Sequence, residues 1–372
     1  MPRLALAQRT AWQRLRKHLH HALDDQPVQT IRLALSAFDS LPFRRCGTEA
    51  MWLPREDELA CMNRGLLPAL TRAGVAMPTA VLASLTRKAD EEMRLVQAAA
   101  ESAEEPTISL HRHRRDAVCS LVLRGAASGE QTAFSVTARR LEWLRRAHRH
   151  HMAVAGQSAD VLEAAFRRRA FRMLARYDGV GGGLGGAGNQ AAVPSEVYAA
   201  LETAFDAPAG SAAEAFASPL NHRLHRDRAA RAGAARQAAV PSWFGTAFPD
   251  VDRPFGSIGS FFSLARLPPS PPTTTPTPTP TPPHLMLLNP PFVSWAMEAL
   301  TPALTRLLSS AAADGDASGG RAYGAAPAVA LVVVPALGKR SHDEARHVDL
   351  LEGSRPSTYL PLTFHGLPST FH

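Results

Sequence analysis

The chain has 372 residues, of which 45% are hydrophobic and 20% are charged. This composition supplies enough apolar side chains for one or two globular domains and excludes a wholly disordered protein. The longest apolar run, Ala325–Leu337, is broken by two prolines and is shorter than the roughly 20 residues of a membrane-spanning helix, so we expect a soluble protein. Three scattered cysteines exclude a disulfide framework and a CxxC zinc site, and predict reduced thiols and no metal: Cys46, Cys61 and Cys119.

The N-terminal segment is both basic and amphipathic. Trp12, Leu15, Leu19 and Leu23 recur at the spacing of one helix face, which predicts an amphipathic helix at the start of the chain. Five cations precede the first acid, Asp24, as they do in organellar transit peptides: Arg3, Arg9, Arg14, Arg16 and Lys17. Exposed arginine-rich helices are common, so we favour the helix.

Residues 1–176 are predicted to form a mostly helical domain. Alanine, leucine and arginine dominate there, and Val81–Ala100 and Leu141–Arg176 place apolar residues three and four positions apart. One β-hairpin interrupts this pattern, with strands at Asp116–Leu123 and Gln131–Ala138 joined by the loop Gly125–Gly129.

The net charge of +8 is concentrated in the first half of the chain. Residues 1–176 hold 28 Lys and Arg against 18 Asp and Glu, whereas residues 177–372 hold 13 against 15. Arginine binds phosphate through a planar fork, so an arginine-rich face suits an RNA backbone, although a solvated helix face has the same composition. Our candidate RNA-binding residues are Arg112, Arg114, Arg115, Arg145, Arg146 and Arg149.

From residue 177 onwards, apolar strands alternate with helices. The expected elements are the helix Ser195–Phe205, the strands Ala213–Ala217 and His284–Leu288, the helix Trp295–Ser310 and the strand Ala328–Val334. Unbroken apolar strands that alternate with helices predict a parallel sheet buried on both faces. A proline- and threonine-rich tract at residues 268–283 is expected to form an extended insert within this second domain, residues 177–372.

A tetrapeptide with a specific chemistry follows the strand His284–Leu288. Asn289-Pro290-Pro291-Phe292 is typical of methyltransferases that act on planar amino or amide nitrogens, and by itself it does not distinguish adenine in DNA, adenine in RNA and glutamine in protein. The lone pair of such an amine is delocalised, and the Asn289 side-chain oxygen and the Pro290 carbonyl can each accept one of its N–H bonds, which returns electron density to nitrogen. Proline holds that carbonyl in place, and Phe292 offers a face for base stacking. A Pro-Pro turn after a strand is the structural alternative.

Three further blocks precede this motif: Gly188–Tyr198, Glu214–Asn221 and Ala247–Phe262. They include Ser218-Pro219-Leu220-Asn221 and Phe248-Pro249-Asp250-Val251-Asp252, which are more specific than the tetrapeptide. In order and in sequence, the blocks resemble the phosphorylated CTD-interacting factor family, the cap-specific adenosine N6-methyltransferases. The resemblance extends over about residues 177–340.

The resemblance implies an α/β fold in which a mostly helical domain precedes a Rossmann-like class I methyltransferase core. It implies S-adenosyl-L-methionine as methyl donor and, as substrate, the adenosine beside the cap of mRNA, which is 2′-O-methylated in the family reaction that we assign. The catalytic motif would be Asn289, Pro290, Pro291 and Phe292. The candidate donor-binding residues are Ser218, Pro219, Asn221 and Asn289, because ligands of such sheets bind beyond the carboxyl ends of the strands.

The family also implies a location and a protein partner. We expect a nuclear protein, with the cytoplasm as the alternative, that binds the capped 5′ end of RNA and the phosphorylated C-terminal domain of RNA polymerase II. No membrane association is expected.

The chain departs from the family pattern in three respects. We find no WW domain, the residues after Phe292 lack the acidic character expected of the family, and only 38 residues follow Val334. The last feature predicts a truncated C-terminus, because these residues are few for the remaining strands and helix. Two alternatives stay open: a DNA adenine N6-methyltransferase, and a non-catalytic adaptor that binds RNA or the polymerase tail.

Overall fold

The structure is a computed structural model, and it describes residues 2–39, 41, 66–101, 107–112, 118–124, 131–154, 156–179, 195–205, 212–222, 243–264, 285–289, 294–313 and 329–332. Pro290, Pro291 and Phe292 lie outside the described residues, as do Arg114, Arg115 and the proline- and threonine-rich tract. The described part has a mixed α/β fold that is mostly helical and contains a parallel sheet.

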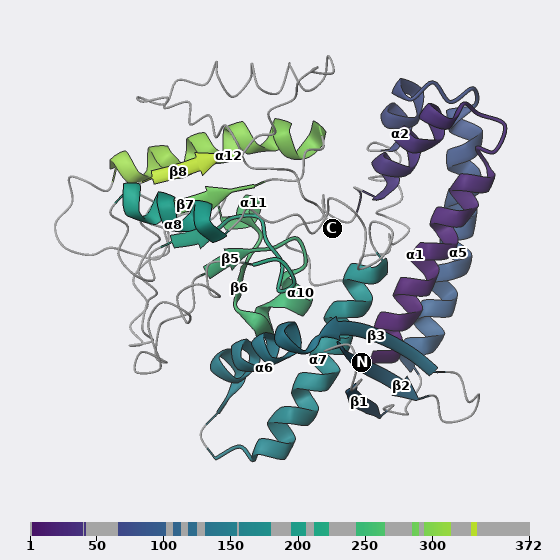
Figure 1. The fold of residues 1–372 in the computed structure, drawn as a ribbon. Coiled ribbons are helices and arrows are strands. Elements are labelled where there is room, and N and C mark those ends of the chain that lie inside the picture. Colours follow the sequence, from purple (N-terminus) through teal and green to yellow (C-terminus); the bar gives the residue numbers. More distant parts are fainter. Residues whose placement is uncertain are drawn as a thin grey trace.

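Three helices at the N-terminal end pack into a helical arm (Figure 1). They are α1 (Pro2–His21), α2 (Val28–Asp39) and α5 (Pro78–Glu101), and residues 66–72 form a further helical segment. α1 lies along α5. Trp12, Leu15 and Leu19 are buried on its inner face, which confirms the predicted amphipathic helix.

The cations of α1 contribute to the packing of the arm. Arg14 pairs with Glu92 of α5 at 3.2 Å, and Arg16 pairs with Asp39 of α2 at 3.0 Å. Glu92 is almost completely buried, and burying a carboxylate is favourable only when a cation compensates its charge. The basic N-terminal segment is therefore part of the fold.

A three-stranded antiparallel sheet follows the arm. Its strands are β1 (Ile108–Arg112), β2 (Val118–Arg124) and β3 (Gln131–Thr137), in the order β1-β2-β3. The predicted hairpin is confirmed as β2 and β3, in which Leu121 pairs with Phe134. The edge strand β1 is not predicted from the sequence, because its five residues are too few to establish a period of two.

Two helices connect the antiparallel sheet to the rest of the molecule. The segment in which the sequence predicts helical spacing, Leu141–Arg176, forms two helices, α6 (Ala138–Met152) and α7 (Ala159–Gly179). Gly156, between them, has a φ of +81°, a left-handed conformation that glycine adopts without a steric penalty. The chain can therefore reverse there, and α7 packs against α6 and α1.

The second sheet is parallel and has five strands in the order β6-β5-β4-β7-β8. The strands are β4 (Ala212–Glu214), β5 (Trp243–Gly245), β6 (Ser257–Gly259), β7 (Leu285–Leu288) and β8 (Val329–Val332). Numbered along the chain, this order is 3-2-1-4-5, which is that of a doubly wound sheet with its switch point between β4 and β7. Strands β4, β7 and β8 confirm the sequence prediction, whereas β5 and β6 are not predicted.

Helices cover both faces of the parallel sheet in the described part of the chain. On one face, Leu201 of α8 (Ser195–Ala204) packs with Leu285 and Leu287. On the other face, α12 (Ser294–Ala313) packs against Met286 and Leu288. The apolar run of β7 is therefore buried on both sides, as its sequence predicts. Three short elements flank β6: α10 (Pro249–Asp252), η2 (Arg253–Phe255) and α11 (Phe261–Leu264).

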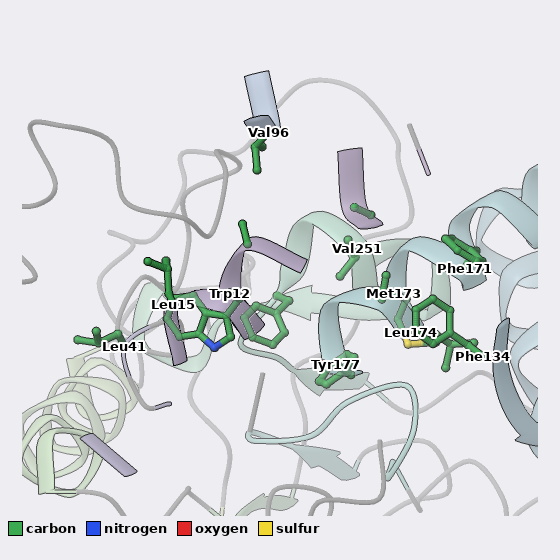
Figure 2. Packing of buried hydrophobic residues seen from close by; sticks show 14 of the residues in the cluster. Trp12, Leu15, Leu41, Val96, Phe134, Phe171, Met173, Leu174, Tyr177 and Val251 are labelled. Atoms are coloured by element: carbon green, nitrogen blue, oxygen red, sulfur yellow. The ribbon is translucent and has the colours of Figure 1, made fainter. Parts of the chain in front are cut away.

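One hydrophobic core joins the helical arm, the antiparallel sheet, α7 and α10. Figure 2 shows part of it, with Met173 and Tyr177 of α7 near Val251 of α10. The sequence places a domain boundary between residues 176 and 177, which lies inside α7. The core extends to both sides of that position, so the helical half and the loop after β5 pack as one body.

Candidate active site

The carboxyl ends of β4 and β7 meet at the switch point of the parallel sheet. Glu214 of β4 is paired in register with Leu287 of β7, so the segments that follow these residues leave the sheet at the same edge. Asn289 follows β7 directly and is half-buried. The predicted donor-binding segment, Ser218–Asn221, follows β4. The structure thus places Asn289 and this segment at one edge of the sheet.

Residues 218–222 form a tight turn, the β4 turn, that is held by its own side chains. The Ser218 hydroxyl donates to Asn221 Oδ1 at 2.9 Å and accepts the Leu220 N–H at 3.1 Å. Asn221 Oδ1 also accepts the Ser218 N–H at 2.7 Å. Ser218 and Pro219 are buried, and Asn221 is half-buried. Ser218 and Asn221 therefore give the turn a fixed shape at the sheet edge.

The ends of β4 and β5 approach each other closely beside the β4 turn. The Ala217 N–H donates to the Gly245 carbonyl at 2.8 Å. A Cβ atom at Gly245 would overlap the Ala215 carbonyl oxygen, which is a backbone atom and cannot rotate away. Glycine is therefore required at position 245 for this approach.

The last residue of the β4 turn, His222, is buried close to the buried Glu214 of β4. His222 Nε2 is 3.8 Å from Glu214 Oε1. The His222 ring contacts Trp143 of α6, with 6.0 Å between ring centroids. Arg140 lies over the Trp143 ring and donates to the Pro219 carbonyl at 3.4 Å. Helix α6 therefore contacts the turn directly, a contact that sequence reasoning misses because about 80 residues separate the two segments.

A second buried polar cluster lies at the carboxyl end of β5. Tyr177 of α7 donates to Asp252 Oδ2 at 2.6 Å, and the Thr246 hydroxyl donates to the same oxygen. Arg176 makes a two-pronged ion pair with Asp250, at 3.2 and 2.8 Å. Both acids belong to the Phe248–Asp252 block of the sequence. In the structure, this block binds the end of α7.

Burial dominates the electrostatics of this cluster. It raises the pKa of Asp252 from 3.8 to about 7, and the hydrogen bonds from Thr246 and Tyr177 oppose the rise only in part. Burial, followed by the nearby Asp252, raises the pKa of Tyr177 well above 10. Tyr177 therefore keeps its proton and remains a hydrogen-bond donor.

The predicted RNA-binding arginines fall into two groups. Arg145 is buried and pairs with Glu163 of α7 at 2.9 Å and with Glu142 at 2.7 Å. This arrangement gives Arg145 a structural role, because it joins α6 to α7. The exposed members, which have no acidic partner among the residues that the structure describes, are Arg112, Arg146 and Arg149.

An open cavity of about 520 Å³ lies between α11 and α12 and is lined by Phe262, Ala299, Pro302 and Arg306. Phe216, which follows β4, packs against Phe262 with ring centroids 5.4 Å apart. The cavity thus adjoins the segment that leads into the β4 turn. Within the described ranges, no group of three His, Cys, Asp or Glu side chains could hold a metal ion. Cys119 is buried and free, and Cys46 and Cys61 lie outside those ranges.

Residues 149–337 match the model of the protein family described as Phosphorylated CTD interacting factor 1 WW domain, and this match covers half of the chain. The chain belongs to the phosphorylated CTD interacting factor 1 family. The resemblance carried by the sequence blocks is thereby confirmed. In this family member, the matched region begins within α6 and includes the β4 turn, Asn289 and the buried polar cluster around Asp252 at the end of β5.

The matched part of this phosphorylated CTD interacting factor 1 family member forms helices and a parallel sheet where the structure describes it. No curated protein and no solved structure matches the chain. No helix in the described part of the chain has the length and apolar character needed to cross a membrane.

Proposed function

We propose that this member of the phosphorylated CTD interacting factor 1 family is an S-adenosyl-L-methionine-dependent methyltransferase that acts on N6 of the cap-adjacent adenosine of mRNA. The observation that carries the proposal is the position of Asn289, directly after β7 and at the edge where the β4 turn leaves the sheet. Ligands of doubly wound sheets bind at this switch point. The proposal includes a Rossmann-like class I methyltransferase core built on the parallel sheet.

The proposed role of Asn289 follows from the chemistry of an exocyclic amine. The Asn289 oxygen accepts one N–H of adenine, and the carbonyl of Pro290, outside the described residues, accepts the other. Both bonds return electron density to the nitrogen, and they gain strength where water is partly excluded, as at the half-buried Asn289. Phe292, also outside the described residues, would stack on the base. The proton can leave after methyl transfer, so the reaction does not require a titrating base.

The β4 turn is the proposed donor site. S-adenosyl-L-methionine would supply an electrophilic methyl group. The turn suits a ligand because the bonds between Ser218 and Asn221 preform it, and Gly245 allows the neighbouring strand end to approach it. Ligand sites are usually preformed in this way. Ser218, Pro219 and Asn221 would shape the site, mainly through the backbone groups that they hold in place.

The capped 5′ end of RNA is the proposed substrate, and α6 offers a surface for its phosphates. Arg139, Arg146 and Arg149 are exposed on α6 and have no acidic partner in the described part of the chain. They span about 15 Å along the helix, which is the length of a few nucleotides. Arg140 connects the same helix to the β4 turn. Phosphates that follow the target adenosine would therefore lie along α6.

The family name indicates an interaction with the phosphorylated CTD. We therefore include the phosphorylated C-terminal domain of RNA polymerase II as a partner and the nucleus as the location. An adaptor without catalysis is the second candidate, and it is favoured by the same exposed arginines, because a phosphoserine also suits the arginine fork.

A methyl-transfer assay tests the proposal. The full chain is incubated with tritiated donor and with capped RNA that starts with A, capped RNA that starts with G, or duplex DNA. We expect label in the A-starting RNA alone. Label in DNA would favour a DNA adenine methyltransferase. No label, together with no donor affinity by calorimetry, would favour the adaptor.

A further inference from the structure

The last turn of α7 is attached to two separate parts of the molecule by consecutive residues. Asp178 pairs with Arg9 of α1, in the helical arm. Tyr177 and Arg176 bind the two acids of α10, as described above. The end of α7, residues 176–178, therefore connects the arm to the loop that follows β5, and we call this connection the joint.

Hydrogen bonds and short stretches of backbone lead from this joint to the β4 turn. Asp252 Oδ2 accepts the hydroxyl hydrogens of both Tyr177 and Thr246. Thr246 follows Gly245, whose carbonyl accepts the Ala217 N–H at 2.8 Å. Ala217 immediately precedes the turn. A displacement at Asp252 is thus transmitted to the turn through a backbone segment that has little freedom to adapt.

The other carboxylate oxygen of Asp252 is buried and has no hydrogen-bond partner within the described ranges. Arg176 of α7 favours the carboxylate, and Asp250 of α10 opposes it. Arg176 also pairs with Asp250, so only part of its positive charge offsets a negative charge on Asp252. Strand β6 carries no titratable side chain, and Arg253 of η2 is exposed. A charge on Asp252 is therefore poorly compensated as long as the joint stays closed.

We propose that Asp252 is a positioning residue that ties the end of α7 to the β4 turn through Thr246, and that the closed arrangement becomes less favourable than an open one as Asp252 loses its proton, because the cost of burying the charge outweighs the gain from the stronger hydrogen bonds of Tyr177 and Thr246. When the joint opens and water reaches the carboxylate, the pKa of Asp252 returns to its ordinary value. The closed joint is then favoured at low pH, and opening increases until the pH reaches about 7, the pKa to which burial raises Asp252.

Hydrogen exchange of the full chain tests the coupling without any ligand. Protection factors, corrected for intrinsic exchange, are measured at pH 5 and pH 8 for peptides that cover residues 212–222 and 243–252. In the wild type, we expect protection to fall by up to about 100-fold in both peptides, since two pH units of linked proton release change the opening constant by that factor. In Asp252→Asn, the ratio between the two pH values should be close to one.

Two further variants keep the test decisive. Tyr177→Phe keeps the aromatic ring and leaves the Asp252 carboxyl group in place, but it removes the hydrogen bond from the Tyr177 hydroxyl. It should therefore lower protection at both pH values and keep the pH dependence. Ser120→Ala removes a buried hydroxyl in the antiparallel sheet and should leave both peptides as in the wild type. A wild type without pH dependence, or an Asp252→Asn variant that keeps it, would overturn the proposal. If Asp252→Asn does not fold, Tyr177→Phe is decisive, and unchanged protection in that variant would overturn the proposal.

The expected effect of Asp252 on donor binding at the β4 turn rests on the proposed function, and it is measured separately from hydrogen exchange. We expect donor affinity, measured by calorimetry, to fall from pH 6 to pH 8 in the wild type, by at most about tenfold, and to stay constant in Asp252→Asn. If the exchange pattern is found but no donor binds at any pH, the coupling stands and the methyltransferase proposal fails. If donor binds with the same pH dependence in both proteins, the positioning role of Asp252 is refuted while donor binding stands.

Discussion

The Asp252→Asn variant should change the pH dependence of stability by an amount that can be calculated. Asp252 is 0% exposed, and burial raises its pKa from 3.8 to about 7. Because the folded state holds this proton more tightly than the unfolded state, the stabilisation is complete below pH 4 and is lost as the pH rises through 7. Between pH 5 and pH 8 the unfolded state has already lost this proton while the folded state still releases it, and this difference lowers the free energy of unfolding by roughly 2–3 kcal/mol.

Urea denaturation of the two proteins at pH 5 and pH 8 measures this difference. Other groups titrate equally in both proteins, so the change in the gap between their free energies of unfolding reports Asp252 alone. We expect the variant to be less stable than the wild type at pH 5, because it buries an amide N–H₂ group, and to gain roughly 2–3 kcal/mol relative to it at pH 8. Parallel pH profiles would refute the argument, since they would mean that Asp252 is ionised in the fold at both pH values.

Three other substitutions test separate parts of the account. Arg145→Gln should destabilise the fold by about 1–3 kcal/mol in thermal or urea denaturation, because Glu163 loses one of its two cations and the link between α6 and α7 is broken, whereas Arg146→Gln should stay within about 0.5 kcal/mol of the wild type. Equal effects of the two changes would contradict the distinction between the buried and the exposed arginines. Changing Arg139, Arg146 and Arg149 together to Gln should make the plot of log affinity against log salt for single-stranded RNA less steep by about 2. The same change at the exposed Arg32, Arg72 and Arg94 should leave the slope as in the wild type. An unchanged slope in the first variant would show that the α6 surface does not bind RNA. Gly245→Ala should cost about 1–3 kcal/mol or more and weaken donor binding, whereas Gly156→Ala, which meets no atom within 4 Å, should leave donor binding unchanged; normal donor affinity in Gly245→Ala would show that the close approach of β4 and β5 is dispensable.

The elements with long apolar patterns are the ones that the sequence predicts. Strand β7 is a run of four buried residues, and its burial on both faces follows from that run. The hairpin of β2 and β3 has seven residues in each strand, enough for pairing to be recognised. In contrast, β5 and β6 have three residues each, and β6 is Ser257-Ile258-Gly259, which has neither alternation nor an apolar run.

The polar groups around the candidate site are not predictable from local pattern. Tyr177 and Asp252 are separated by 75 residues, and only the packing of α7 on α10 brings them together. Arg145 is different, because helical spacing places it near Leu141, Leu144 and His148 on the buried face of α6. That spacing could have separated Arg145 from the exposed Arg146 and Arg149, which the composition alone treats as equivalent.

Mass spectrometry of the first transcribed nucleotide shows whether Asn289 activates the amine. Capped RNA that starts with A is incubated with donor and with the wild type, Asn289→Ala or Asn289→Asp. We expect N6-methyladenosine with the wild type, none with Asn289→Ala at unchanged donor affinity, and partial activity with Asn289→Asp, which keeps an acceptor oxygen. Methylation by Asn289→Ala at the wild-type rate would contradict this role of Asn289.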